Sequence, residues 1–258
     1  MNIIQTIVLA IVEGLTEFLP ISSTGHMILA SSIMSIPEDA FVKTFQISIQ
    51  IGAIMAIVFL YARRFLQGLT IYFKLAVAFI PTGLIGILAY HFIKMYLFNP
   101  ITVSISLVLG GIILILIDKK VVNQKSKTDA LENISYKNAF LIGLFQCISM
   151  IPGVSRAAAT IVGGIFNGLD KKQAMEFSFL LAVPTMLVAT GYDLYKTPVV
   201  FSHHEIVLIC IGLVVAFLTA WIAVKAFVKL VENYGFKYFG YYRIIIGILF
   251  LIFIKEIS

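Results

Sequence analysis

Charged residues are scarce in this chain: they make up 12% of its 258 residues, whereas 60% of the residues are apolar. An ordinary soluble domain is about 45–50% apolar and about 25% charged. A soluble fold of this length cannot bury so much apolar surface, which excludes soluble enzymes, nucleic-acid-binding proteins and disordered proteins. The alternation of a membrane β-barrel is also lacking. The composition predicts a polytopic all-α membrane protein in which residues 1–258 form a single membrane domain.

Two further features are absent. The chain has only two cysteines, Cys147 and Cys210, and both lie in apolar stretches, so no disulfide framework is expected. The segment from Met1 to Val12 carries no basic residue, and no small-residue cleavage site follows it. We therefore expect this segment to belong to the mature fold rather than to a cleaved signal peptide.

Long apolar blocks are what the chain does contain. Six of them are long enough to cross about 30 Å of hydrocarbon at about 1.5 Å per residue. The predicted transmembrane helices are Ala40–Tyr61, Lys74–Phe92, Ile101–Ile117, Gln173–Tyr192, Glu205–Val224 and Tyr241–Ile254.

Two other apolar regions are interrupted by polar residues and proline. Residues 2–36 are broken around Pro20 and the hydroxyl-rich run that follows it, and residues 139–168 are broken around Pro152-Gly153. Each region is expected to form two helices too short to span a bilayer. Broken backbone at membrane depth is tolerated where protein or a watery cavity covers it, so we predict two re-entrant helical hairpins.

A hairpin followed by three spans occurs twice, in residues 1–117 and in residues 138–258, with a polar loop at 118–137 between them. Aligning residues 13–23 on residues 146–156 needs no gap and places Glu13 on Gln146 and Ser22 on Ser155. Because three spans is an odd number, the second half must enter the membrane upside down. The order predicts an inverted-topology repeat.

Lysine and arginine predict the orientation. The links on one side of the membrane hold 13 of these residues, and the links on the other side hold 4. The richer side is expected to be cytoplasmic, with both termini outside and the two hairpin tips meeting within the bilayer. The net charge of +6 is then explained by topology rather than by an anionic partner.

Two carboxylates lie in the first hairpin. Glu13 and Glu17 are four residues apart and share one helix face. Carboxylates in an apolar segment cost several kcal/mol unless a partner compensates them. They are interpreted either as a packed structural pair or as functional groups that clamp a divalent cation, act as general acid or base, or do both.

A cluster of hydroxyls follows Pro20. Ser22, Ser23, Thr24, Gly25 and His26 are what an anion-binding turn with a nucleophile and a base would need. A helix beginning near His26 would direct its positive end at the bound anion. A Ser-rich turn that only caps a helix is the simpler alternative.

The second hairpin supplies Ser155, Arg156 and Thr160. An arginine within the membrane is functional by default, and a guanidinium can bind two phosphate oxygens at once. The alternative is an ion pair of Arg156 with Glu13 or Glu17. Arg243 opens the last predicted span and is interpreted as an interface anchor. The remaining histidines, His91, His203 and His204, lie at predicted outer ends and are expected to be surface residues.

Two of these motifs support a resemblance to a known family. The run Glu-Gly-Leu-Thr-Glu-Phe-Leu-Pro-Ile-Ser-Ser-Thr-Gly-His at residues 13–26, together with Pro-Gly-Val-Ser-Arg at 152–156, resembles the bacterial undecaprenyl-pyrophosphate phosphatases, or bacitracin-resistance proteins. The resemblance implies an integral-membrane enzyme that removes the terminal phosphate of a polyprenyl pyrophosphate and regenerates the lipid carrier for cell-wall glycans. By motif position it implies functional roles for Glu13, Glu17, Ser23, His26 and Arg156, and a divalent cation, Mg²⁺ or Ca²⁺, held by Glu13 and Glu17.

One departure from the family pattern occurs after Arg156. The family typically continues Ser-Arg-Ser-Gly-Ala-Thr, whereas this chain has Ser155-Arg156-Ala157-Ala158-Ala159-Thr160. A hydroxyl contact from position 157 and the backbone freedom of a glycine are lost. A second class of membrane phosphatase, the phosphatidic-acid-phosphatase superfamily, is excluded, because it needs a histidine six residues after the arginine and Val162 stands there.

The sequence thus predicts a multi-pass phosphatase of the bacterial inner membrane whose site opens outward. Catalytic roles are expected for Ser23, His26, Glu17 and Glu13. Substrate binding is expected for Arg156, Ser22, Thr24, Gly25, Ser155 and Thr160. Either Ser23 attacks phosphorus while His26 takes its proton, or His26 or a glutamate activates water directly.

The expected partners are the polyprenyl pyrophosphate and membrane lipids, with no nucleic acid and with homo-oligomers left open. A membrane transporter or polyprenyl-phosphate flippase built on the same repeat is the alternative, because broken helices that meet at the membrane midplane also occur in transporters.

Overall fold

The computed structural model describes residues 1–37, 39–92, 99–121, 131–196 and 201–257. All the long elements in this part of the chain are helices, and it contains no strand. The helices are α1 (Ile3–Thr16), α2 (Ser23–Ile33), α3 (Ala40–Leu60), α4 (Ala62–Leu66), α5 (Leu69–Phe92), α6 (Pro100–Val121), α7 (Tyr136–Ile148), α8 (Arg156–Phe166), α9 (Lys171–Lys196), α10 (His203–Tyr234) and α11 (Lys237–Ile257).

Five of these helices are long and apolar enough to span a membrane over their described residues: α3, α5, α6, α9 and α10. They coincide with five of the six predicted spans and confirm an all-α polytopic membrane protein. The sixth predicted span, Tyr241–Ile254, falls within α11, whose side chains from Phe253 onward lie outside the described residues. The largest difference in bounds is α10, whose 32 residues extend well past the predicted end at Val224.

The two interrupted regions form pairs of short helices, α1–α2 and α7–α8. Each break ends at a serine with positive φ, 72° at Ser22 and 71° at Ser155, so the two aligned serines have nearly the same backbone conformation. Gly153 has φ of +92°, and a Cβ there would lie 2.5 Å from the carbonyl oxygen of Val103. Only glycine therefore fits this turn without strain. Helix α2 begins at Ser23 rather than near His26.

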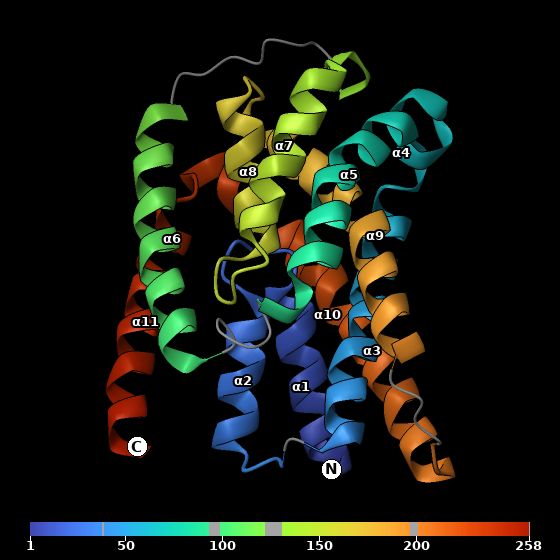
Figure 1. The fold of residues 1–258 in the computed structure, drawn as a ribbon, viewed down its shortest axis with the longest axis vertical. Coiled ribbons are helices and arrows are strands. Elements are labelled where there is room, and N and C mark those ends of the chain that lie inside the picture. Colours follow the sequence, from blue (N-terminus) through green and yellow to red (C-terminus); the bar gives the residue numbers. More distant parts are fainter. Residues whose placement is uncertain (38, 93–98, 122–130, 197–200, 258) are drawn as a thin grey trace.

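Figure 1 shows the two pairs entering the bundle from opposite ends, with α1 and α2 in the lower half and α7 and α8 in the upper half. Both termini lie at the lower end. The most extensive helix contacts are α6 with α11, α1 with α10, α3 with α10, α5 with α7, α3 with α9, and α8 with α9. Exchanging the two halves of the chain maps α1–α10 onto α5–α7 and keeps α3–α9 and α6–α11, as an inverted repeat requires, whereas the contact of α8 with α9 has no comparable counterpart between α2 and α3. The repeat itself stays a prediction.

Small residues bring the short helices close to the long ones. A Cβ at Gly14 of α1 would lie 2.6 Å from the carbonyl oxygen of Ala216 in α10. A Cβ at Gly143 of α7 would lie 2.1 Å from that of Ala78 in α5. Close backbone approach at small residues is how membrane helices associate, since lipid provides no hydrophobic drive between them.

The ends of several helices are joined by ion pairs. Lys171 at the start of α9 lies 3.6 Å from Asp118 of α6, and Arg64 of α4 pairs with Glu176 of α9. Helix α4 lies at the upper end of the bundle, opposite both termini (Figure 1). Residues that the sequence assigned to the cytoplasmic side thus gather at one end of the molecule.

Candidate active site

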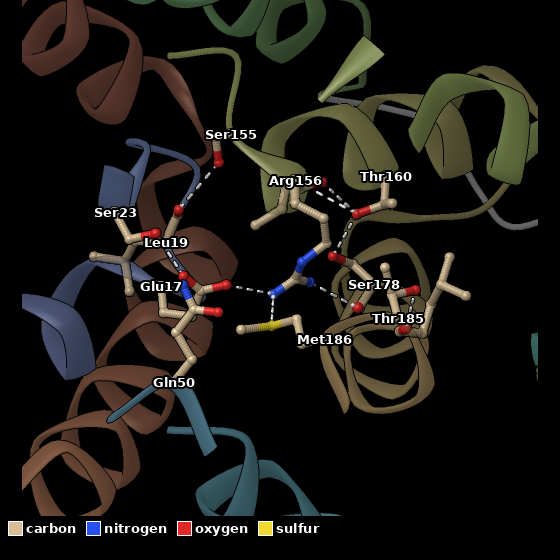
Figure 2. Close-up of polar contacts among 12 residues, drawn as sticks. Glu17, Leu19, Ser23, Gln50, Ser155, Arg156, Thr160, Ser178, Thr185 and Met186 are labelled. Atoms are coloured by element: carbon tan, nitrogen blue, oxygen red, sulfur yellow. Dashed lines mark hydrogen bonds and ion pairs between the residues drawn. The ribbon is translucent and has the colours of Figure 1, made fainter. Parts of the chain in front are cut away.

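The two breaks touch in the middle of the bundle. Ser155 Oγ, at the second break, donates to the carbonyl oxygen of Leu19 in the first break, at 3.5 Å. Beside it, Arg156 Nη2 donates to Glu17 Oε1 at 3.3 Å (Figure 2). Residues more than 130 positions apart therefore form one polar site, as the meeting of the hairpin tips predicts.

Glu17 is the centre of this site. Its carboxylate is buried, and its second oxygen, Oε2, accepts a hydrogen bond of 2.5 Å from the hydroxyl of Ser23 (Figure 2). Ser23 is the first residue of α2, so the turn after Pro20 brings its hydroxyl back towards the end of α1. A hydroxyl bonded to a carboxylate is the arrangement of a nucleophile with its base.

Arg156 is held on three sides. Nη1 donates to the carbonyl oxygen of Ser178 at 3.1 Å, Nη2 also contacts the sulfur of Met186 at 3.5 Å, and the guanidinium lies over the ring of Phe18 at 5.5 Å. Its Nε is buried and has no hydrogen-bond partner among the described residues. One donor of this cation is therefore left unpaired by the described part of the chain.

Glu13 lies one turn before Glu17 on α1, and its side chain is 1% exposed. Its Oε1 has no hydrogen-bond partner among the described residues. Gln146, which the sequence alignment places at the corresponding position, is fully satisfied: its amide nitrogen donates to Thr82 at 2.8 Å and to Thr185 at 3.3 Å. Of these two aligned residues, Glu13 has a side-chain oxygen without a hydrogen-bond partner among the described residues, and Gln146 has none.

His26 is held by two contacts. Its Nδ1 lies 2.8 Å from the carbonyl oxygen of Ser22, and its Nε2 lies 2.7 Å from the hydroxyl of Tyr242 on α11. The two rings stack with 7° between their planes. A carbonyl oxygen can only accept, so the neutral imidazole carries its proton on Nδ1 and accepts from Tyr242 at Nε2. Among the described residues, no hydrogen bond joins His26 to Ser23.

The other predicted binding residues differ in exposure and in the hydrogen bonds that their side chains already make. Thr24 is exposed, whereas Gly25 packs towards Val103 of α6. The hydroxyl of Thr160 is bonded to Ser178 at 2.6 Å, and that of Ser155 accepts from the backbone of Ala158 at 3.2 Å. The side chain of Ser22 makes no capping bond, and only the carbonyl of this residue contacts His26. Their roles in binding a substrate stay predictions.

The family departure at position 157 lies inside the molecule. Ala157 is fully buried in the apolar core that contains Phe18.

The interpretation of Arg243 as an interface anchor is wrong. This side chain is fully buried and donates only to backbone carbonyls. Three acceptors belong to the breaks themselves: the carbonyls of Pro20 and Gly153, both at 2.9 Å, and that of Val154 at 3.1 Å. The other two belong to α6, Ser106 at 3.0 Å and Leu107 at 3.3 Å. The sequence feature that could have revealed the interior role of Arg243 is the one used for Arg156. An arginine inside an apolar segment needs a partner in the protein interior.

The carboxylates fit the expected divalent cation in their chemistry. Glu13 Oε1 is a buried oxygen without a partner, and Mg²⁺ and Ca²⁺ prefer such hard ligands. Over the described part of the chain, no group of three or more His, Cys, Asp or Glu residues surrounds a common point. A cation here would have two carboxylates and would need water or substrate oxygens as its other ligands.

Comparisons with known proteins agree over nearly the whole chain. A family model described as bacitracin resistance protein BacA matches residues 6–249. The undecaprenyl-diphosphatase of Wolinella succinogenes is 51% identical over 257 residues, which cover 100% of both chains. That of Flavobacterium johnsoniae is 52% identical over 98% of this chain and 96% of its own. That of Campylobacter jejuni is 47% identical over 97% and 94%.

Proposed function

Since the chain belongs to the bacitracin resistance protein BacA family, we propose that it hydrolyses undecaprenyl diphosphate to undecaprenyl phosphate and phosphate. The names of its relatives supply the substrate. The fold supplies the setting, because a multi-pass membrane protein can take a lipid diphosphate directly from the bilayer.

One observation carries the proposal: the carboxylate of Glu17 accepts from both the Ser23 hydroxyl and the Arg156 guanidinium. A nucleophile and a cation thus each lie within hydrogen-bonding distance of the same base. Phosphoryl transfer needs such positioning and charge compensation more than it needs covalent chemistry from the protein.

In the first step, Ser23 Oγ attacks the terminal phosphorus while Glu17 accepts the hydroxyl proton. The bond from that phosphorus to the bridging oxygen breaks, and undecaprenyl phosphate leaves. Arg156 binds non-bridging oxygens through Nη2, which now donates to Glu17, and through its unpartnered Nε. In the second step, water cleaves the phosphoserine ester and releases phosphate.

We assign His26 to the second step, as the base for the attacking water. The carbonyl of Ser22 fixes its Nδ1 proton, which leaves Nε2 as the basic atom. The hydroxyl of Ser23 is already bonded to Glu17, so that carboxylate rather than His26 is the better candidate for the first proton transfer.

Glu13 and Glu17 would hold the divalent cation. When bound, Mg²⁺ or Ca²⁺ would neutralise charge on the diphosphate oxygens. The unpartnered Oε1 of Glu13 supports this assignment.

The proposed location is the bacterial inner membrane, with the site open to the outside. The distribution of lysine and arginine supports this orientation, since the basic helix ends gather opposite the two termini.

The decisive experiment uses purified protein in detergent with undecaprenyl diphosphate, and measures released phosphate with and without Mg²⁺ or Ca²⁺. Steady release without any membrane gradient is the expected result. A transporter or flippase would release none. Absence of phosphate across pH and divalent-ion conditions would therefore overturn the proposal in favour of transport.

A further inference from the structure

Gln50 is a polar side chain near the middle of α3 that the proposed mechanism does not use. It is half-buried, and a polar group at this depth in a membrane span is costly without a partner. Its amide oxygen has one, because Thr190 Oγ1 of α9 donates to Gln50 Oε1 at 3.4 Å. Its amide nitrogen donates to none of the described residues. Two N–H donors are therefore left for a ligand.

The contact with Thr190 fixes which way the amide is turned. An amide oxygen only accepts, so the Thr190 hydroxyl is the donor and holds Oε1 against α9. The amide nitrogen must then be directed away from Thr190. Figure 2 shows the side chain of Gln50 extending from α3 towards Glu17. The end of the side chain that carries the unpaired donor thus lies on the side of Glu17.

Helix α9 places Gln50 about one turn from Arg156. Met186 of α9 contacts Arg156 Nη2 at 3.5 Å, and Thr190 follows Met186 by four residues. Residues four apart share a helix face, so the face of α9 that contacts Arg156 contacts Gln50 about 6 Å further along. Helix α9 runs towards the end of the bundle that holds both termini (Figure 1). Gln50 therefore lies beside Arg156, on the side nearer the termini.

We propose that Gln50 binds the terminal phosphate of the substrate and thereby distinguishes the lipid diphosphate from the lipid monophosphate. The inference rests on the proposed function, which places the diphosphate at Ser23 and Arg156. The proposed site opens towards the end of the molecule that holds the termini, and free phosphate leaves in that direction. A donor on that side lies nearest the phosphate group that is removed. The lipid product lacks this group and so lacks the contact with Gln50.

A neutral amide suits this position. Phosphate oxygens accept hydrogen bonds, and the amide nitrogen offers two donors. Arg156 already supplies positive charge, so an amide adds hydrogen bonds without a further charge that would retain the released phosphate. Because Thr190 holds the amide oxygen, the donors are oriented before the substrate arrives, and less side-chain freedom is lost on binding.

The first test compares Gln50→Leu with the matched control Gln46→Leu. Gln46 lies one turn earlier on α3, and its amide nitrogen already donates to Ser31 Oγ at 3.0 Å. A hydrogen bond to a charged group contributes about tenfold or more in affinity, so Gln50→Leu is expected to raise KM for undecaprenyl diphosphate about tenfold and Gln46→Leu less than about twofold. Melting temperatures are measured on the same detergent preparations. Equal KM values for the two variants, with a lower melting temperature for Gln50→Leu, would show that Gln50 only joins α3 to α9 and would overturn the inference.

The second test measures binding without turnover. The probes are farnesyl methylenediphosphonate, which has a methylene group in place of the bridging oxygen, and farnesyl monophosphate. Gln50→Leu is expected to weaken binding of the diphosphonate about tenfold and to leave binding of the monophosphate unchanged, because only the diphosphonate has a terminal phosphorus group for the amide. An equal loss for both probes, or no loss for either, would contradict the inference.

The two proposals fail in different ways. If the wild-type protein releases no phosphate but Gln50→Leu selectively weakens binding of the diphosphonate, Gln50 binds the terminal phosphate and the proposed hydrolysis is wrong. If phosphate is released while Gln50→Leu changes neither KM nor the binding of the two probes, the hydrolysis stands and the inference about Gln50 is wrong.

Discussion

Two buried atoms at the site, Glu13 Oε1 and Arg156 Nε, have no partner among the described residues. One is an acceptor and the other is a donor. Leaving such an atom unpaired costs about 1–3 kcal/mol, and more where the group is charged. A bound diphosphate would satisfy the guanidinium, and a cation would satisfy the carboxylate. The groups that the proposed reaction brings would thus give both atoms a partner.

Replacing Arg156 tests that idea. Loss of one comparable electrostatic contact costs about 10²–10³ in turnover, so Arg156→Ala is expected to lose that much phosphate release. Arg156→Lys keeps the charge without the planar fork and is expected to recover only part of the activity. Turnover and melting temperature are measured on the same detergent preparation.

The ion pair with Glu17 gives the competing structural interpretation. In that case Arg156→Ala strands a buried carboxylate and lowers mainly the melting temperature and the folded yield. A well-folded Arg156→Ala protein with nearly normal turnover would eliminate Arg156 from the site.

Ser23→Ala separates the two hydrolytic mechanisms. If Ser23 forms the phosphoserine, turnover is expected to fall by orders of magnitude, because no other atom replaces its oxygen. Rapid quenching of the wild-type protein with labelled substrate should then trap phosphate on Ser23. A variant that keeps about a tenth or more of the activity would favour direct attack by water activated by His26 or Glu17.

Tyr242→Phe removes the hydroxyl that bonds His26 and keeps the stacked ring. One neutral hydrogen bond is worth about 0.5–1.5 kcal/mol, so kcat is expected to fall about 2- to 10-fold. The control is Tyr241→Phe, which makes the same change at the neighbouring, exposed tyrosine. Equal kcat values for the two variants would show that the bond to His26 does not matter for turnover.

At the scale of elements, α11 joins the two breaks through Arg243. Replacing this residue by Met leaves five backbone carbonyls without their donor. A loss of more than about 3 kcal/mol of stability is expected, seen as a lower melting temperature and a poor folded yield. Arg243→Lys has three donors instead of five and is expected to be intermediate. Unchanged melting of Arg243→Met would show that the breaks hold without it.

The short helices could be predicted, but their internal geometry could not. Pro20 and Pro152-Gly153 each divide an apolar region into two helices that are too short to span a membrane. Both predicted interruptions are present in the structure. The positive φ values of Ser22 and Ser155 could not be predicted from the sequence. Residues other than glycine rarely adopt such φ values, and no local residue pattern requires them at these two positions. They persist because tertiary contacts hold the turns.

Individual site residues could be predicted from the sequence only where a polar residue lies within an otherwise apolar segment. Glu17, Ser23 and Arg156 do so, and the structure brings them together. Tyr242 does not stand out, because tyrosine is common near membrane interfaces, and its contact with His26 depends on the packing of α11 against distant α2. The pairing of Ser23 with Glu17 rather than with His26 likewise depends on how the turn after Pro20 folds back.

At the scale of the whole molecule, the orientation in the membrane is open to test. In a background without Cys147 and Cys210, a cysteine at Asn99 is expected to react with an impermeant maleimide added outside intact cells. A cysteine at Gln124, which lies outside the described residues, is expected to react only after the cells are permeabilised. Reversed labelling would place the site on the cytoplasmic side.

The position of Arg243 along the chain affects when the protein becomes active during synthesis. Helix α11 follows every other described helix, so the ribosome has made both hairpins before the side chain that joins them exists. A nascent chain can insert its earlier helices before Arg243 is available to donate hydrogen bonds to the carbonyls of Pro20 and Gly153. Hydrolytic competence should therefore arrive only at the end of translation, and chains that stop before α11 should be inert and sensitive to quality-control proteases.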